Sequence, residues 1–197
     1  MKKDKLSLDK IQAEIARNLT DAVTSREHPF RLMVIGTIGM QAANLRTVVL
    51  RAFQADRFLL TFYTDIRSQK INELQNNPNL TCLFWDQERQ IQIKIVGKTE
   101  IEHNTQHTQS IWKNMHIGAK KAYLTLSAPS SIQNTVSNNL PENLLTIDEK
   151  LLDDQYFCMV HCEIKRMEWL QLGRSAHIRA EFQKNEFGQW KGHWLVP

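Results

Sequence analysis

The sequence feature that most constrains the fold is a strict alternation of apolar and polar residues within residues 90–102. Isoleucine occupies positions 91, 93 and 95, and glutamine or lysine occupies the positions between them. Successive side chains of a β-strand point to opposite faces, so this pattern predicts a strand with one face in a hydrophobic core. Such a strand needs partner strands, which the rest of the chain must supply.

Other segments carry the β-branched and aromatic residues that are typical of strands, with short turns between them. The predicted strands are Arg31–Ile38, Leu45–Phe53, Phe58–Thr64, Thr81–Trp85, Phe157–Trp169, His177–Phe182 and Gln189–Val196. Their close succession predicts a mainly β fold, an antiparallel barrel or sandwich that carries helical inserts. A doubly wound α/β fold is excluded because the chain lacks βαβ units.

Three segments are predicted to be helices. In the N-terminal region, residues 1–28, apolar residues recur at helical spacing behind Ser7, a suitable N-cap. A short helix is predicted at Ser68–Asn76, where the following Asn77–Pro78 breaks it, and a third at about His103–Tyr123.

The segment 127–146 is rich in Ser, Asn and Pro and predicts a long loop or lid. No linker or internal repeat divides the chain. The 197 residues are therefore expected to form one domain, 1–197.

Charge and hydropathy argue against several classes of protein. The formal net charge is only +4, with no stripe of Lys and Arg, so we expect no nucleic-acid partner. No apolar segment approaches the roughly 20 residues that span a bilayer, and the N-terminus lacks the pattern of a signal peptide. We therefore expect no membrane partner and a cytoplasmic location. The three cysteines form no CxxC pair and are predicted to be reduced thiols: Cys82, Cys158 and Cys162.

No metal site is predicted. Cys158, His161 and Cys162 fit no zinc-binding spacing, and the two cysteines would share the core face of a strand. His103 and His107 lack the glutamate of an HExxH motif. No GxSxG elbow supports a serine-hydrolase triad, and no glycine-rich phosphate loop is present.

A candidate anion site lies where the predicted strand 58–64 meets the following helix. Lys70 falls in the first helical turn, close to Thr64 and Ser68. A cation there opposes the helix dipole, but a bound phosphate would reverse this penalty, and Arg46 and Arg51 could complete a cationic clamp. The alternative is a solvated basic surface with Lys70 turned into water.

A second candidate group lies near one end of a predicted hairpin. Trp169 ends one strand, while His177 and Arg179 share a face of the next if that segment is a strand. Such a set could stack on and polarise an aromatic cofactor. Gln90 opens the alternating strand on its polar face. The alternatives are a surface histidine and a solvated glutamine.

A series of short motifs extends over the chain from about residue 30. They are Arg46–Arg51, Phe62–Thr64, Ser68–Lys70, Glu73–Leu74, Asn77–Pro78, Phe84–Trp85, Glu88–Gln90, Val96–Gly97, Glu168–Trp169, His177, Arg179 and Trp194–Pro197. In this order they resemble the pyridoxine/pyridoxamine 5′-phosphate oxidase superfamily of FMN-binding split barrels. The C-terminal part resembles the oxidase-related branch more than the vitamin B6 enzyme.

The resemblance implies a six-stranded antiparallel split β-barrel and a homodimer with FMN in two clefts between the subunits. It implies catalytic roles for His177 and Arg179 and substrate contacts for Arg51 and His177. The implied cofactor contacts, some of them from the partner subunit, are Arg46, Thr47, Val48, Val49, Leu50, Arg51, Tyr63, Thr64, Ser68, Gln69, Lys70, Gln90, Trp169 and Arg179.

The chain departs from the oxidase pattern around the substrate and the phosphate. Gln69 stands where the oxidases have an arginine, and Ser175–Ala176 stand where they have Arg-Leu. The segment Trp112–Lys121 does not match the family's substrate-phosphate cluster, and Arg51 replaces a lysine. We therefore expect FMN binding without efficient pyridoxamine 5′-phosphate oxidation.

The expected function is FMN-dependent oxidoreduction of an unidentified small molecule, with hydride transfer to flavin N5. Retention of Arg51, His177 and Arg179 favours an enzyme. The alternatives are a non-catalytic FMN carrier or redox sensor, and a barrel that binds another ligand, such as haem, through His177.

Overall fold

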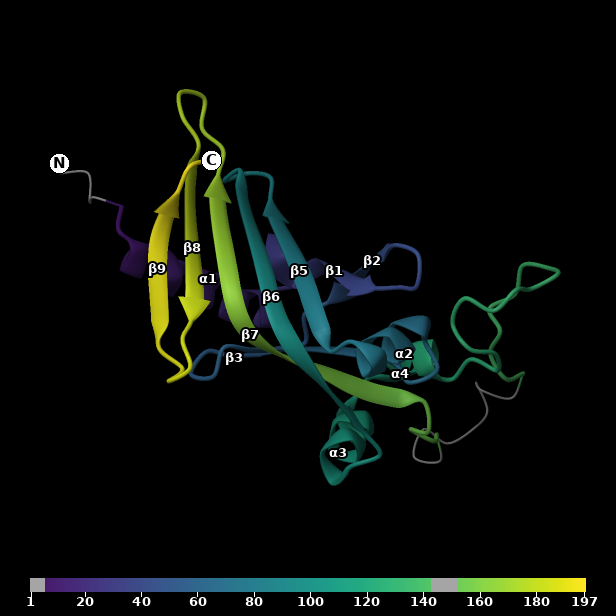
Figure 1. The fold of residues 1–197 in the computed structure, drawn as a ribbon. Coiled ribbons are helices and arrows are strands. Elements are labelled where there is room, and N and C mark those ends of the chain that lie inside the picture. Colours follow the sequence, from purple (N-terminus) through teal and green to yellow (C-terminus); the bar gives the residue numbers. More distant parts are fainter. Residues whose placement is uncertain (1–5, 143–151) are drawn as a thin grey trace.

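The computed structural model describes residues 6–142 and 152–197, and a large antiparallel sheet dominates it (Figure 1). The helices are α1 (Leu8–Thr24), α2 (Gln69–Asn76), α3 (Gln106–Asn114) and α4 (Ile117–Lys120), with 3₁₀ turns at Pro29–Arg31 and Lys121–Tyr123. The strands are β1 (Leu32–Ile38), β2 (Ala43–Val49), β3 (Ala52–Gln54), β4 (Leu59–Asp65), β5 (Asn79–Asp86), β6 (Ile91–His103), β7 (Phe157–Gln171), β8 (Ile178–Lys184) and β9 (Trp190–Leu195).

The sheet curls into a barrel because the strands at its two ends are consecutive in the chain. The strand order is β2-β1-β5-β6-β7-β4-β3, so β2 and β3 lie at opposite ends. Leu50 and Arg51 join them: the Leu50 amide donates to the Arg31 carbonyl (2.9 Å) and the Arg51 amide to the Thr61 carbonyl (2.8 Å). The predicted strand 45–53 is therefore broken at these two residues, which bridge the two ends of the sheet.

The barrel is split along β7. This strand pairs with β6 over most of its length, while its other edge pairs first with β4 and then with β8. The hairpin β8–β9 therefore lies beside the second half of β7, where β4 no longer pairs with it (Figure 1). The sheet of the described residues thus has nine strands rather than the expected six, because the short β3 and the β8–β9 hairpin join it.

A β-bulge between β6 and β7 requires glycine at position 97. The register shifts between Val96 and Gly97. A Cβ atom on Gly97 would lie 2.4 Å from the Glu163 carbonyl oxygen and 2.6 Å from the Cys162 sulfur. These contacts are far below van der Waals separation, so no other side chain fits without movement of the backbone.

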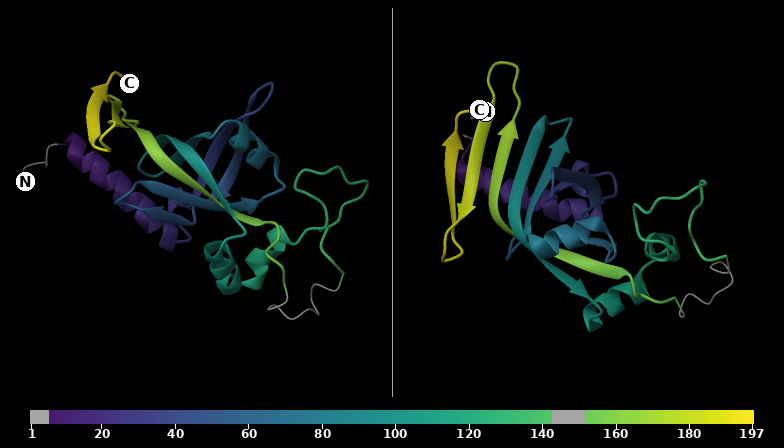
Figure 2. Two further views of the ribbon diagram at one scale, coloured as in Figure 1. Left: turned by 60° about the horizontal axis from the view of Figure 1, so that its bottom comes forward. Right: turned by 45° about the vertical axis from the view of Figure 1, so that its right-hand side comes forward.

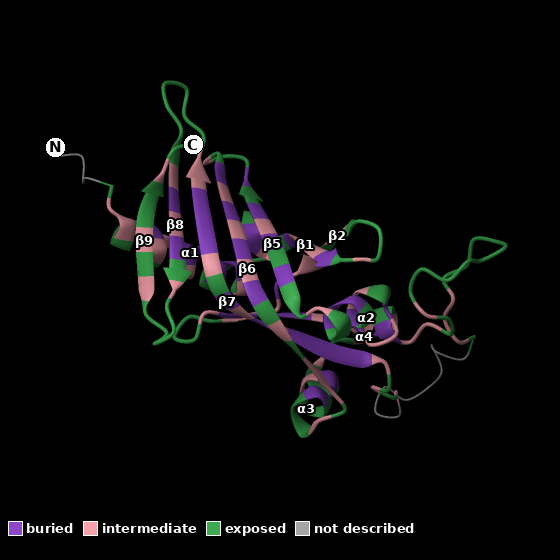
Figure 3. Ribbon diagram, in the orientation of Figure 1, coloured by how far each residue is buried: buried purple, intermediate pink, exposed green. Residues whose placement is uncertain are grey.

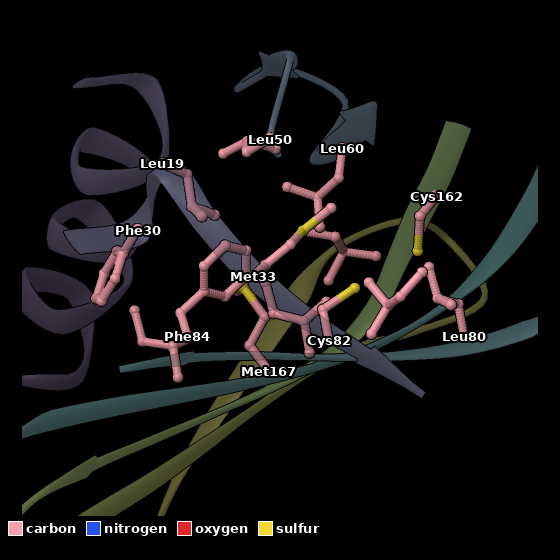
Figure 4. Packing of buried hydrophobic residues seen from close by; sticks show 14 of the residues in the cluster. Leu19, Phe30, Met33, Leu50, Leu60, Leu80, Cys82, Phe84, Cys162 and Met167 are labelled. Carbon is pink, nitrogen blue, oxygen red and sulfur yellow. The ribbon is translucent and has the colours of Figure 1, made fainter. Parts of the chain in front are cut away.

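One hydrophobic cluster fills the barrel, and Figure 4 shows part of it. α1 contributes Ile11, Ile15 and Leu19, whose helical spacing was the signal for this helix. In Figure 2, α1 lies beside β3, away from α3. Buried and exposed residues alternate along β5, as Figure 3 shows. The prediction that Cys158 and Cys162 face the core is confirmed, and the thiols of the three cysteines are free.

The predicted helix 103–123 is wrong as one element. β6 continues to His103, and a capping box at Thr105 starts α3. His116 accepts a hydrogen bond from the Gly118 amide through its side chain and caps α4. The predicted loop is confirmed only for residues 127–142, which contain no helix or strand; residues 143–146 lie outside the described residues.

No helix in the described ranges is long and apolar enough to cross a membrane.

Candidate functional site

The predicted anion site lies at the junction of β4 and α2. Ser68 is the N-cap of α2, but its hydroxyl makes no capping hydrogen bond and lies 3.4 Å from the Thr64 hydroxyl. The first-turn amides therefore lack a side-chain partner. Lys70 Nζ donates to the same Thr64 hydroxyl at 2.9 Å. Two hydroxyls, an ammonium and a helix N-terminus thus meet at one point, which is a suitable environment for an anion.

Lys70 is a half-buried cation without a carboxylate partner in the described part of the chain. Burial lowers its pKa, and the positive charge of Arg46 lowers this pKa further. The free protein therefore holds two cations near one another at an electrostatic cost. An anion between them would remove that cost.

Arg46 is held on one side by a buried polar network. Its Nη1 donates to the Thr37 hydroxyl and to the Asn44 carbonyl (2.9 Å), and its Nη2 donates to Glu73 Oε2 (3.1 Å). Nε and the second N–H of Nη2 have no partner among the described residues. Arg46 keeps 23% of its side chain exposed, so these two donors are available to a ligand.

The residues that follow Arg46 do not all face a ligand. Leu50 is fully buried and its side chain faces the core, so its expected contact with the cofactor is a prediction for its backbone. Thr47 is exposed, whereas Val48 and Val49 are half-buried, and Val48 packs against the core.

Arg51 lies against an aromatic cluster on the outer face of the barrel. Its guanidinium carbon is 5.6 Å from the centroid of the Tyr63 ring. Burial raises the pKa of Tyr63, and it raises the pKa of Tyr123 to about 12. Both phenols stay protonated at neutral pH, and Arg51 is the cation that faces them.

Gln69 and Arg67 have different surroundings from Lys70. Gln69 is exposed and lines a pocket of about 380 Å³ between α2 and the β1–β2 turn. Arg67 pairs with Asp65 (2.6 Å), and its guanidinium lies 3.5 Å from the Tyr156 ring centroid. Arg67 is therefore neutralised and does not belong to the anion site.

The second predicted group lies on two neighbouring connections: the turn that joins β5 to β6, and the loop that joins β7 to β8. Gln90 has a left-handed backbone (φ 53°) and belongs to the turn rather than to β6. The Leu172 amide donates to the Gln90 carbonyl (2.9 Å), which ties the turn to the loop. His177 precedes β8, is exposed, and accepts a hydrogen bond from the Gly173 amide at Nδ1 (3.2 Å).

Arg179 is fixed by Glu168, which is only 7% exposed and also pairs with Lys94. Burial alone would raise the pKa of Glu168, but hydrogen bonds from Lys94 and Arg179 outweigh it and lower this pKa. The carboxylate therefore stays charged and holds the Arg179 guanidinium on the outer face of the sheet.

Trp169 does not join this group. It is 2% exposed and belongs to the core cluster, and it pairs with Ala180, the inward neighbour of Arg179. Adjacent strand residues point to opposite faces, so Trp169 and Arg179 point away from each other. The contact between Trp169 and a cofactor that the resemblance implies stays a prediction.

One chain does not bring the two groups together. The junction with α2 and the β7–β8 loop lie at opposite ends of the molecule (Figure 1). Arg46, Thr64, Ser68 and Lys70 form one partial site, and Gln90, His177 and Arg179 form another.

Sequence reasoning missed the role of Glu73, Thr37 and Asn44 in holding Arg46. It also missed a Glu102 carboxylate that binds His161 (2.8 Å) and His107 (3.1 Å). No spacing links such partners, because they come from different elements. Within the described ranges, no group of three or more His, Cys, Asp or Glu side chains is arranged to hold a metal ion.

Residues 11–103 match the family model described as "Pyridoxamine 5'-phosphate oxidase, FMN-binding domain". The pyridoxine/pyridoxamine 5′-phosphate oxidase of Pelagibacter ubique is 36% identical over an alignment of 171 residues, and the match covers 78% of this chain and 75% of that protein. The cofactor of the matched domain is FMN.

Two solved structures have a similar fold. An FMN-binding protein from Nostoc punctiforme, related to pyridoxamine 5′-phosphate oxidase, has a TM-score of 0.75 and 19% identity and covers 98% of this chain and 100% of its own. PhzG from Burkholderia lata, solved with tetrahydrophenazine-1-carboxylic acid, has a TM-score of 0.75, 17% identity and 98% coverage of both chains. Because the identities are only 19% and 17%, the similarity to these two structures shows a shared fold and nothing more.

Proposed function

Because the chain belongs to the pyridoxamine 5′-phosphate oxidase family of FMN-binding proteins, we propose that it is an FMN-dependent oxidoreductase acting on a small molecule. The observation that carries the proposal is that Arg46 and Lys70, at the N-terminus of α2, both keep N–H donors available to a ligand. The departures at Trp112–Lys121 and Ser175–Ala176 lead us to propose a substrate other than pyridoxamine 5′-phosphate.

The described residues fit the phosphate group of FMN. Two N–H donors of Arg46, the Lys70 ammonium, the Ser68 hydroxyl and the first-turn amides of α2 would hold it. These groups supply the positive charge and the donors that a phosphate dianion requires. When bound, FMN would supply the flavin N5 atom, which accepts a hydride.

We propose that two copies of the chain complete the site. The phosphate clamp of one copy, formed by Arg46 and Lys70, would then meet Gln90, His177 and Arg179 of the other copy. Within one chain these three residues lie too far from the clamp. A groove of about 380 Å³ on the outer face of β1, β2, β5 and β6 supports this proposal, since it is mainly apolar and includes Leu45, which is 71% exposed. Exposed apolar grooves of this kind are typical of interfaces.

In this arrangement His177 and Arg179 orient the substrate. The Gly173 amide occupies Nδ1 of His177, which leaves Nε2 available to a substrate. Glu168 fixes the Arg179 guanidinium, which would attract an anionic group.

Mixing two variants tests the shared site. Lys70→Met and Arg179→Met chains would each bind FMN weakly, but a mixed dimer contains one site with both native residues. Random exchange between equal amounts of the two variants makes half of the dimers mixed, so recovery of about a quarter of the FMN sites is expected. No recovery between variants that exchange subunits would contradict a site shared between copies.

Anaerobic reduction of the FMN-loaded protein by NADH, NADPH or vitamin B6 phosphates, followed by reoxidation in air, tests catalysis. His177→Ala should reduce the reduction rate by at least about ten-fold, as expected for loss of a positioned group, and should retain FMN. His193→Ala, an exposed histidine on β9, is the matched control. An unchanged rate in the His177 variant would remove its catalytic role, and failure of every donor would favour the carrier.

A further inference from the structure

A buried carboxylate lies behind the phosphate clamp. We propose that Glu73 is a positioning residue: it determines which edge of Arg46 faces the ligand and thereby makes the site prefer a phosphorylated flavin over riboflavin. This inference rests on the proposed FMN site and adds a determinant of its specificity.

Glu73 lies in the middle of α2 and is 7% exposed. Its Oε2 accepts hydrogen bonds from the Thr37 hydroxyl and from Arg46 Nη2 (3.1 Å), and its Oε1 accepts one from the Asn44 amide. Burial alone would raise the pKa of Glu73, but the bonds from Thr37, Asn44 and Arg46 outweigh it and lower this pKa. Glu73 is therefore an ionised group that joins α2 to β1 and β2.

This network uses three of the five N–H donors of Arg46. Both donors of Nη1 are taken, by Thr37 and by the Asn44 carbonyl, and Glu73 takes one donor of Nη2. The two that remain, on Nε and Nη2, lie parallel on one edge of the planar guanidinium. This is the edge that can bind two oxygens of one phosphate. Glu73 thus occupies the end of the guanidinium and leaves the two-donor edge for the ligand.

Glu73 also controls the charge of the clamp. It offsets the charge of Arg46, so Lys70 provides the uncompensated positive charge in the free protein. Without Glu73, the repulsion between Arg46 and Lys70 would be stronger and the guanidinium would lose its anchor. Riboflavin lacks the phosphate, so its binding does not depend on this edge.

The test compares FMN and riboflavin affinities by quenching of flavin fluorescence. Glu73→Ala should lower the FMN affinity at least about ten-fold, as expected for loss of a charge-assisted bidentate contact, and should change riboflavin affinity less than about two-fold. Glu73→Gln retains the shape, because the Asn44 amide can turn to accept, and should keep FMN affinity within about three-fold of wild type. Glu186→Ala, an exposed glutamate in the β8–β9 turn, is the control.

The outcomes separate this inference from the proposed function. A wild type that does not bind FMN overturns both. If the wild type binds FMN, two results for the Ala variant overturn the role of Glu73 alone. One is an unchanged ratio of FMN affinity to riboflavin affinity, and the other is an equal loss of both affinities. If the Ala variant does not fold, Thr37→Val removes the hydroxyl that links Glu73 to Arg46. It should then lower the same ratio, and an unchanged ratio overturns the inference.

Discussion

Replacement of Lys70 by Met separates a ligand-binding role from a structural one. In the free protein the Lys70 ammonium is half-buried, lies near Arg46 and has one hydrogen bond, to Thr64. An apolar side chain of similar length keeps the packing and removes the repulsion. The free variant should therefore unfold at the same temperature as wild type or higher, whereas its FMN affinity should fall.

The size of the loss follows from the donors that Lys70 has available. The Thr64 hydroxyl takes one of its three N–H groups, so two can reach the phosphate. A hydrogen bond to a charged group contributes roughly 1.5–3 kcal/mol. A loss of about 2 kcal/mol corresponds to about thirty-fold weaker FMN binding.

Thermal unfolding with and without FMN measures this loss. At a concentration about 100 times the wild-type Kd, FMN should stabilise wild type by about 2.7 kcal/mol and the variant by about 0.9 kcal/mol. For a chain of 197 residues each kcal/mol shifts Tm by roughly 2–4 °C. Lys191→Met, an exposed lysine on β9, should behave as wild type. An unchanged FMN shift, or an equal loss of riboflavin binding, would refute the assignment of Lys70 to the phosphate.

Three further predictions concern packing and charge. Gly97→Ala should destabilise the protein by at least about 1–3 kcal/mol in urea, because its Cβ would lie 2.4 Å from the Glu163 carbonyl oxygen; unchanged stability would contradict the close approach. The pKa of Glu168 is lowered in the folded protein, so the ionised carboxylate stabilises the fold above about pH 4.5, and this stabilisation is lost as the pH falls through the pKa of the folded state. Glu168→Gln should therefore flatten the acid side of a plot of stability against pH. An identical plot for the variant would argue against the pairing of Glu168 with Lys94 and Arg179. FMN should raise the lowered pKa of Lys70, so alkaline calorimetry in buffers of different ionisation enthalpy should detect proton uptake that Lys70→Met abolishes.

The parts of the fold that sequence predicted well depend on local signals. The isoleucines at 91, 93 and 95 face the core because a strand has a period of two residues. The helix after Ser68 begins and ends where its N-cap and the Asn77–Pro78 breaker indicated. The prediction of an anion site at Lys70 depends on the same local junction.

The parts that sequence missed depend on tertiary structure. The break at Leu50–Arg51 exists because the ends of the sheet meet there, which no local pattern records. Glu73 and Arg46 are 27 residues apart and meet only because α2 packs against β1. The inward direction of Trp169 depends on its register with Ala180.

FMN binding is tested most directly by the absorbance spectrum of the purified protein, with the acid-released chromophore identified by chromatography. If each chain binds FMN, the protein will show flavin absorption bands and release FMN in a one-to-one ratio to chains. A colourless protein that also fails to take up added FMN would contradict the proposal that Arg46, Lys70 and the N-terminus of α2 hold the phosphate of FMN.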